Sequence, residues 1–314
     1  MAFSHMPVLL AETLEALAVK AGGFYVDGTA GGGGHAEAIL RASEPDGRLL
    51  ALDRDEAAVR RVRERLQAWG ERVQVVHGRF SEIAEWVSRF GPGPADGVLF
   101  DLGMSSFQVD DPARGFSFQS DGPLDMRMDL SAPRTAAQWL NEEPESEMAR
   151  VLKEWGEEPA AKRIARAVVA RRAERPFGRT SELAELVTAV KGGRRGRRIH
   201  PATQTFQAVR MAVNGEMEQI ALGLEAALRA VRPGGRVAAI SFHSVEDRLV
   251  KRTLGAHVPR WESLQEGGQR RHGRLPSVRW VRKKPWVAGP QECAANPRAR
   301  SAKLRAVEVE TNAA

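Results

Sequence analysis

Short apolar runs alternate with amphipathic stretches along most of the chain. The short runs are rich in β-branched and aromatic residues, which favour strands. The longer stretches carry apolar residues at every third or fourth position, which favours helices. Because strands and helices alternate, the pattern predicts βαβ units and a parallel sheet. Strands are expected at residues 24–26, 48–52, 73–76, 97–100, 236–241, 278–281 and 304–309.

The alternation stops after residue 101. Residues 102–123 are rich in Gly, Ser, Asp and Phe and predict a long loop, and such loops are often functional. From Thr135 to Val213 the periodicity predicts helices alone. The strand and helix pattern then returns, although residues 255–276 are polar and Gly-rich and are expected to be mobile. The sequence therefore indicates an α/β domain that is interrupted by an all-helical insertion.

The most specific local signal lies between Val26 and His35. It places five glycines within residues 28–34, between a predicted strand and a predicted helix. Glycine allows a sharp turn and lets a ligand approach the backbone closely. A strand, a Gly-rich turn and a helix N-terminus together form the nucleotide-binding corner of a doubly wound sheet. The alternative is a tight turn that binds nothing.

Acidic residues end the neighbouring predicted strands. Asp27 ends the first, and Asp53 ends the second, roughly 20 residues after the glycines, where a carboxylate can bind both hydroxyls of a ribose. Asp101 ends the fourth strand, and His243 follows the fifth. Ligands of an open parallel sheet bind outside the carboxyl ends of its strands, so these side chains should converge on one site.

Composition narrows the class of protein. The chain has 314 residues, of which 42% are hydrophobic and 28% charged, as is usual for a soluble globular protein. It has no apolar run long enough to cross a bilayer, and its first residues lack the features of a signal peptide. A cytoplasmic protein without a membrane partner is therefore expected. The single cysteine, Cys293, excludes an internal disulfide and a cysteine-based zinc cluster, and no metal is expected.

Charge is distributed unevenly along the chain. Residues 1–193 carry 24 basic and 30 acidic residues, whereas residues 194–314 carry 23 basic and 10 acidic residues. A basic half on an otherwise acidic protein suggests a polyanionic partner, above all a nucleic acid. The alternative is an arginine-rich surface that is simply solvated.

Long motifs are spread over nearly the whole chain. They are HMPVLL (5–10), DGT (27–29), GGGH (32–35), DLGMSS (101–106), RGFSF (114–118), PLDMRM (123–128), PATQTFQA (201–208), SFHSVEDR (241–248) and NPRARSAKLR (296–305). Together they resemble one known family, the bacterial S-adenosylmethionine-dependent methyltransferases that modify N4 of cytosine 1402 in 16S ribosomal RNA. One departure is Gly215, where the family usually has aspartate.

The resemblance implies a class I, Rossmann-like methyltransferase sheet with an inserted helical domain. Residues 1–108 and 214–314 would form the discontinuous methyltransferase domain, and residues 109–213 the insertion, which would help to recognise RNA. S-adenosylmethionine would be the cofactor. Its implied contacts are Gly33, Gly34, His35, Asp53, Phe80, Asp101 and Gln108.

Each implied contact has a physical rationale. The glycine loop would pack against the methionine end of the cofactor, and Asp53 would hold the ribose hydroxyls. Phe80 would pack on the adenine, unless it belongs to the core. Asp101 would accept a hydrogen bond from a cofactor amino group. Gln108 would be a further contact to the cofactor, and the alternative is a loop residue exposed to solvent.

The implied reaction is direct displacement at the sulfonium methyl group, with the three reacting atoms aligned in the site. The N4 amine is a weak nucleophile because its lone pair is conjugated with the ring, so an acceptor for an N4 proton would help. The Pro-Pro-aromatic motif that many amino methyltransferases carry after strand four is absent. The candidate acceptors are Asp101, Ser105 and His243, the last of which is otherwise a structural residue at a strand end.

The expected substrate is 16S ribosomal RNA, within the small ribosomal subunit. The target base must leave its stack to be methylated. The aromatic residues Phe107, Phe116 and Phe118 could stack on it or cover the hinge to the helical domain. The expected phosphate contacts are Arg114, Arg127 and the basic segments 191–198, 270–274, 279–284 and 298–305.

Other classes of protein remain open at this stage. A DNA amino methyltransferase would share the cofactor corner but would usually carry the missing Pro-Pro-aromatic motif. A ribosome-assembly factor without enzymatic activity could use the basic half alone, and it would not bind the cofactor. A nicotinamide dehydrogenase fits less well, because no Gly-x-Gly-x-x-Gly entry to a helix is present. The sequence leaves the oligomeric state open, with a homodimer as one option.

Overall fold

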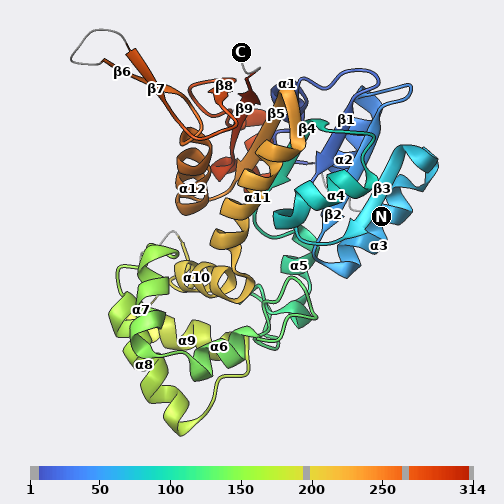
Figure 1. The fold of residues 1–314 in the computed structure, drawn as a ribbon. Coiled ribbons are helices and arrows are strands. Elements are labelled where there is room, and N and C mark those ends of the chain that lie inside the picture. Colours follow the sequence, from blue (N-terminus) through green and yellow to red (C-terminus); the bar gives the residue numbers. More distant parts are fainter. Residues whose placement is uncertain (1–6, 194–198, 264–268, 311–314) are drawn as a thin grey trace. The chain divides into compact units, whose positions relative to one another are not determined.

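The computed structural model describes residues 7–193, 199–263 and 269–310, which belong to two units (Figure 1). The sheet unit comprises Met1–Gly103 and Met217–Ala314, and the helical unit comprises Met104–Glu216. The position of one unit relative to the other is not determined, so each is described by itself. The domain boundaries expected from the sequence are 108/109 and 213/214.

A seven-stranded sheet forms the centre of the sheet unit, in the order β3-β2-β1-β4-β5-β9-β8. The strands β1 to β5 are parallel, which confirms the α/β prediction. The order of the strands reverses between β1 and β4, and this is the point at which an open sheet binds its ligands. The strands are β1 (Phe24–Asp27), β2 (Arg48–Asp53), β3 (Val73–His77), β4 (Ala95–Asp101), β5 (Val231–Ser241), β8 (Val278–Trp280) and β9 (Lys303–Val309).

Helices cover both faces of this sheet (Figure 1). Alternate residues of each strand point to opposite faces, so Val26 packs on one side and Tyr25 on the other. The first face packs against α4 (Ile83–Phe90), α11 (Glu216–Ala230) and α12 (Ser244–Gly255). The second packs against α1 (Leu10–Leu17), α2 (Gly34–Ala42) and α3 (Glu56–Leu66). The unit is therefore an α/β/α sandwich.

Three local features go beyond what the sequence pattern predicts. β9 runs antiparallel to β5, and β8 antiparallel to β9, because an antiparallel neighbour needs no helical crossover. The stretch 255–276 contains a hairpin of β6 (Arg260–Ser263) and β7 (Gln269–His272), whose polar sequence shows no hydrophobic alternation. The stretch 102–123 contains the five-residue helix α5 (Ser106–Asp110), which is too short to show helical periodicity.

The helical unit has a core of its own. It is built from apolar residues such as Trp139, Ile164, Leu183 and Phe206, one from each of four helices. The buried Asn214 accepts a hydrogen bond from Met128 N and donates to Met126 O, which ties the loop before the helices to the last helix. The helices after α5 are α6 (Ala136–Glu142), α7 (Glu145–Glu154), α8 (Ala161–Glu174), α9 (Thr180–Val190) and α10 (Thr203–Asn214).

Two kinds of feature are absent from the described residues. No helix in residues 7–193, 199–263 and 269–310 is both long and apolar enough to span a bilayer. Over the same ranges, no three side chains of His, Cys, Asp or Glu are grouped so that they could hold a metal ion.

Candidate functional site

The glycine loop connects β1 to α2 and is held by both neighbouring strands. Gly28 N donates to Leu99 O of β4 (2.9 Å), and Ala30 N donates to Leu52 O of β2 (2.8 Å). A Cβ atom on Gly28 would lie 2.8 Å from the buried ring of Phe100, so only glycine fits there. Gly33, which precedes α2, has a φ of +78°, a conformation that glycine adopts without strain. The backbone at the start of α2 is therefore left uncovered by side chains of the loop.

Asp53 connects the end of β2 to this loop. Its Oδ2 accepts a hydrogen bond from Gly31 N, and its Oδ1 accepts one from Asp55 N, both at 2.8 Å. Each carboxylate oxygen has a second lone pair, so further donors such as ribose hydroxyls can still be accepted. Burial raises the pKa of Asp53 above its ordinary value, although the two backbone donors oppose this shift.

Asp27 lies at the end of β1 and is almost fully buried. Its Oδ1 accepts from Thr29 N (3.1 Å), and Thr29 Oγ1 accepts in turn from Asp101 N (2.6 Å). Burial raises the pKa of Asp27 to about 7, and the nearby Asp53 carboxyl group adds to the shift. The first and fourth strands are thus linked where their ends diverge.

Asp101 has an incompletely bonded carboxyl group. Its Oδ1 is buried and has no hydrogen-bond partner within the described part of the chain. Its Oδ2 lies 3.6 Å from His35 Nδ1, and the side chain keeps 28% of its surface exposed. Burial, together with the carboxyl groups of Asp27 and Glu246, raises the pKa of Asp101 to about 8. The free protein therefore carries Asp101 mostly as the neutral acid at pH 7.

His35 is the first-turn residue of α2 that faces Asp101. It is buried, and its Nε2 lies 3.0 Å from Val8 O. A carbonyl oxygen only accepts, so Nε2 carries the proton and Nδ1 is free to accept. Burial lowers the pKa of His35 to about 4, so the ring is neutral at pH 7.

His243 and Glu246 lie at the start of α12, beyond the end of β5. His243 Nε2 lies 2.7 Å from Glu246 Oε1, and His243 Nδ1 accepts from Glu246 N at 3.4 Å. Glu246 is fully buried and also accepts from Phe242 N (2.9 Å). Both ring nitrogens of His243 are therefore engaged in capping the helix.

Phe80 follows β3 and is half-buried. Its ring meets Phe100 edge to face, with 5.4 Å between the ring centroids. The same ring lies against Gly223 of α11, where a Cβ atom would come within 2.4 Å of it. Phe80 therefore packs on the core with part of its surface and leaves the remainder for a ligand.

Six of the seven residues proposed to contact the cofactor belong to the sheet unit. They are Gly33, Gly34, His35, Asp53, Phe80 and Asp101. A Gly-rich loop, an acid with spare lone pairs and a buried carboxyl oxygen that has no partner among the described residues suit a ligand that carries a ribose and positive charge. S-adenosylmethionine has both features, so these residues fit it. Glu246 was missed, although the His-x-x-Glu spacing after a strand resembles a capping box.

Ser105 and Gln108 lie in the helical unit. They form the capping box of α5, in which Ser105 N donates to Gln108 Oε1 (3.0 Å) and Gln108 N donates to Ser105 Oγ (3.3 Å). Their contacts to a cofactor or substrate stay a prediction.

The other candidates of the helical unit hold its own structure. Arg114 donates to Arg127 O and Met128 O, and Arg127 binds Asp125 with both ends of its guanidinium. Phe116 is buried in the core. Phe118 stacks on His200 with a centroid distance of 4.3 Å, whereas Phe107 is 40% exposed.

The basic segments differ in how far their side chains are exposed. Within the sheet unit, Lys283, Lys284, Arg298 and Arg300 are exposed. By contrast, Arg305 is bonded to Asp247 (2.6 Å). Residues 194–198 and the side chains of residues 270 and 271 lie outside the described part of the chain.

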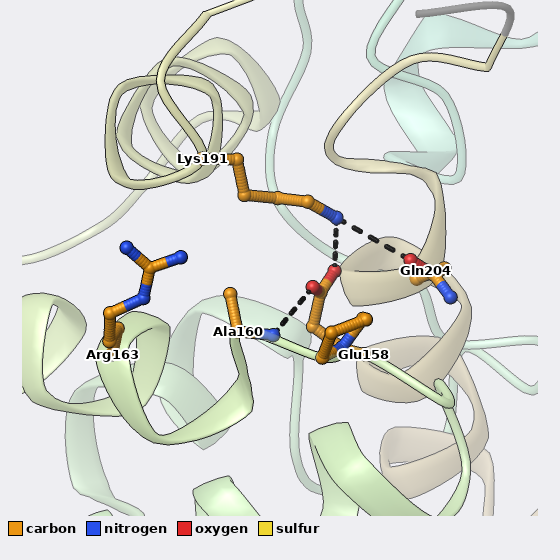
Figure 2. A pocket seen from close by; sticks show the side chains of 6 residues that line it. Glu158, Ala160, Arg163, Lys191 and Gln204 are labelled. Carbon is orange, nitrogen blue, oxygen red and sulfur yellow. Dashed lines mark hydrogen bonds and ion pairs between the residues drawn. The ribbon is translucent and has the colours of Figure 1, made fainter.

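The helical unit also contains a cavity of about 210 Å³ (Figure 2). Lys191 Nζ donates to Glu158 Oε2 at 2.7 Å and to Gln204 Oε1 at 3.4 Å across this cavity. Glu158 Oε1 accepts from Ala160 N at 3.0 Å. Because these buried groups satisfy one another, they are the features of a structural ion pair rather than of a binding site.

The strand order and the acidic site at the switch point define a Rossmann-like, doubly wound α/β fold. A family model described as the MraW methylase family matches residues 2–310, and the chain belongs to this family. Its methyl donor is S-adenosylmethionine.

Two named relatives are similar to this chain over almost its whole length. A "Ribosomal RNA small subunit methyltransferase H" of Symbiobacterium thermophilum is 50% identical over 98% of this chain and 97% of its own. The protein of the same name from Geobacter sulfurreducens is 49% identical over 98% and 99%. Among solved structures, an rRNA methylase from Streptococcus thermophilus aligns over 99% and 100% with 11% identity and a TM-score of 0.44.

Proposed function

We propose that this protein transfers a methyl group from S-adenosylmethionine to the exocyclic N4 of cytosine 1402 in 16S ribosomal RNA. The observation that carries the proposal is the near half identity, over almost the full chain, to proteins named for methylation of small-subunit ribosomal RNA. The long motifs from HMPVLL to NPRARSAKLR support the narrower assignment to N4 of that cytosine.

When bound, S-adenosylmethionine supplies an electrophilic sulfonium methyl group. In our proposal the glycine loop and His35 receive its methionine end, Asp53 binds the ribose hydroxyls, and Phe80 packs on the adenine. Gln108 is proposed as a further contact. Asp101 accepts a donor through the oxygen that has no partner within the described residues.

The proposed acceptor of the N4 proton is Asp101, with Ser105 and His243 as the alternatives. Asp101 is favoured because the side chains of Ser105 and His243 already cap helices. A cation bound beside Asp101 favours its charged form, which can then accept a hydrogen bond from the amine. Alignment of the amine with the methyl group accounts for the remaining catalysis.

We further propose that residues 109–213 act as an RNA-recognition domain, and residues 1–108 and 214–314 as the methyltransferase domain. The exposed basic residues Lys283, Lys284, Arg298 and Arg300 would follow the RNA backbone. Such binding should weaken steeply with salt. The place of action would be the cytoplasm, where small subunits are assembled.

Transfer of radiolabel from S-adenosylmethionine tests the proposal. The substrates are small ribosomal subunits, naked 16S RNA and duplex DNA, each from cells that lack this protein. Label in N4-methylcytosine at position 1402 of the ribosomal RNA is the expected result. Label in DNA alone, or no label in any substrate despite cofactor binding, would overturn the assigned substrate.

A further inference from the structure

One peptide group near the N-terminus is held at both of its ends. Its N–H, from Leu9, donates to Glu292 Oε1 at 2.7 Å. Its carbonyl, from Val8, accepts from His35 Nε2 at 3.0 Å. Because the N–H and C=O of a trans peptide point in opposite directions, Glu292 and His35 hold the Val8–Leu9 peptide from opposite sides.

The conformation of Leu9 shows that this peptide needs such support. Leu9 has a φ of +54° and a ψ of 41°, a left-handed conformation that is uncommon for a residue with a side chain. The side chain is completely buried, and Pro7 lies close against Gly34 of the cofactor loop. A conformation of this kind persists only where the surroundings determine it.

The orientation of the peptide decides which nitrogen of His35 carries the proton. A carbonyl directed at Nε2 requires the Nε2–H tautomer, which leaves Nδ1 as an acceptor that faces Asp101 Oδ2. A flipped peptide would present its N–H to the ring and favour the other tautomer. His35 Nδ1–H would then compete with the cofactor for the carboxylate.

We propose that Glu292 is a positioning residue of the cofactor site: it fixes the Val8–Leu9 peptide and thereby the tautomer of His35 beside Asp101. Glu292 lies in α13 (Pro290–Ala295), far from His35 in the sequence, and its hydrogen bond to Leu9 N connects it to His35 through this peptide. The effect on the cofactor rests on the proposed roles of His35 and Asp101, whereas the effect on the tautomer does not.

The test compares Glu292→Gln with Glu292→Met. Glutamine keeps an oxygen that accepts from Leu9 N, whereas methionine has a similar length but only a weakly accepting sulfur. The exposed neighbour in the same helix provides the control variant Gln291→Ala. If Glu292→Met fails to fold, Glu292→Asp, which keeps the charge but shortens the reach, replaces it.

Nitrogen NMR of histidine-labelled protein, without cofactor, reports the tautomer of His35. The Nε2–H form should predominate in the wild type, Glu292→Gln and Gln291→Ala, and should lose population in Glu292→Met. An unchanged tautomer in Glu292→Met would overturn the positioning role.

Calorimetric titration with S-adenosylmethionine tests the consequence. We expect the Kd to rise about fivefold in Glu292→Met, as for the loss of one hydrogen bond, and to stay within about twofold in the other two variants. A changed tautomer with an unchanged Kd would overturn the link to the cofactor. That result would count against the proposed role of His35, while the methyl-transfer assay tests the substrate separately.

Discussion

Two buried ion pairs of the helical unit differ from the buried acids at two strand ends of the sheet unit. In the helical unit, Lys191 pairs with Glu158 at 2.7 Å, and Arg210 binds Glu216 through two hydrogen bonds of 2.8 Å. In the sheet unit, the ends of β1 and β4 carry acids whose burial is not compensated by a basic side chain, and Asp101 keeps an oxygen without a partner among the described residues.

This difference separates structural polar groups from functional ones. Burial of a charge costs free energy unless the charge is paired and hydrogen-bonded, so a fold that needs only stability satisfies each group internally. Groups left unsatisfied where an open sheet binds its ligands indicate that a ligand completes them. Five predictions test whether the two regions differ in this way.

The largest effect is expected from the ion pair of the helical unit. Lys191→Met leaves the Glu158 carboxylate buried without its partner, which should lower the free energy of unfolding by about 3–5 kcal/mol. Urea denaturation measures this value. The exposed Arg163 lines the same cavity, and Arg163→Ala should change the stability by less than about 0.5 kcal/mol. The cofactor affinity of folded Lys191→Met, measured at low temperature, should equal that of the wild type. A loss of affinity would contradict the distinction between structural and functional polar groups.

Asp101→Ala should have the next largest effect, now on function. Removal of a preorganised polar group at a reacting centre typically costs about 10²–10³ in rate, and we expect a loss of this size in methyl transfer. Stability should not fall, because the variant removes an acid whose burial is uncompensated. A destabilised but active variant would place Asp101 with the structural groups instead.

The same residue predicts a dependence on pH. Since the pKa of Asp101 is raised to about 8, the neutral acid is the main form below pH 8 in the free protein. A cationic cofactor binds the charged form better, so its affinity should increase from pH 6 to 8 and level off above. Asp27 and Glu246, which face Asp101, oppose its ionisation, and His35 stays neutral over this range. Titration calorimetry of Asp101→Asn should show a shallower increase, because Asp27 still titrates near pH 7.

Much of this site can be predicted from the sequence, because its signals are local. The glycines, Asp53 and Asp101 follow strands that the hydrophobic pattern identifies, and parallel strands bring their ends to one edge. The pattern fails for the polar hairpin β6–β7, where backbone pairing and not burial of a face defines the element. It also cannot show that Glu292 meets Leu9, because that contact joins residues 283 positions apart.

Substitution of Asp27 offers a further test, with a smaller expected effect on stability. The unfolded chain releases its proton near the ordinary value of 3.8, whereas the folded protein retains it up to about pH 7. The protonated Asp27 carboxyl group therefore contributes its full stabilisation below pH 3.8, and this stabilisation is lost as the pH rises to 7. Asp27→Asn removes this loss, so above pH 7 it should be more stable than the wild type by about 1–2 kcal/mol. The amide protons need partners, which offsets part of the gain. Thermal unfolding at pH 5 and 8 measures the difference, and equal stability at pH 8 would contradict the argument.

Substitution of His243 should have the smallest effect. It tests whether His243 belongs to the structural polar groups or to the functional ones. Its Nδ1 accepts from Glu246 N in the first turn of α12, so His243→Ala should lower the stability by about 1 kcal/mol, the usual cost of a lost helix cap. Asparagine is a good capping residue, so His243→Asn should recover most of this loss. If the residue only caps the helix, methyl transfer by His243→Asn stays within about threefold of the wild type. A loss of activity in both variants, with stability restored in His243→Asn, would instead assign the N4 proton to His243. The imidazole ring of His243 would then be a functional group, like the carboxyl group of Asp101.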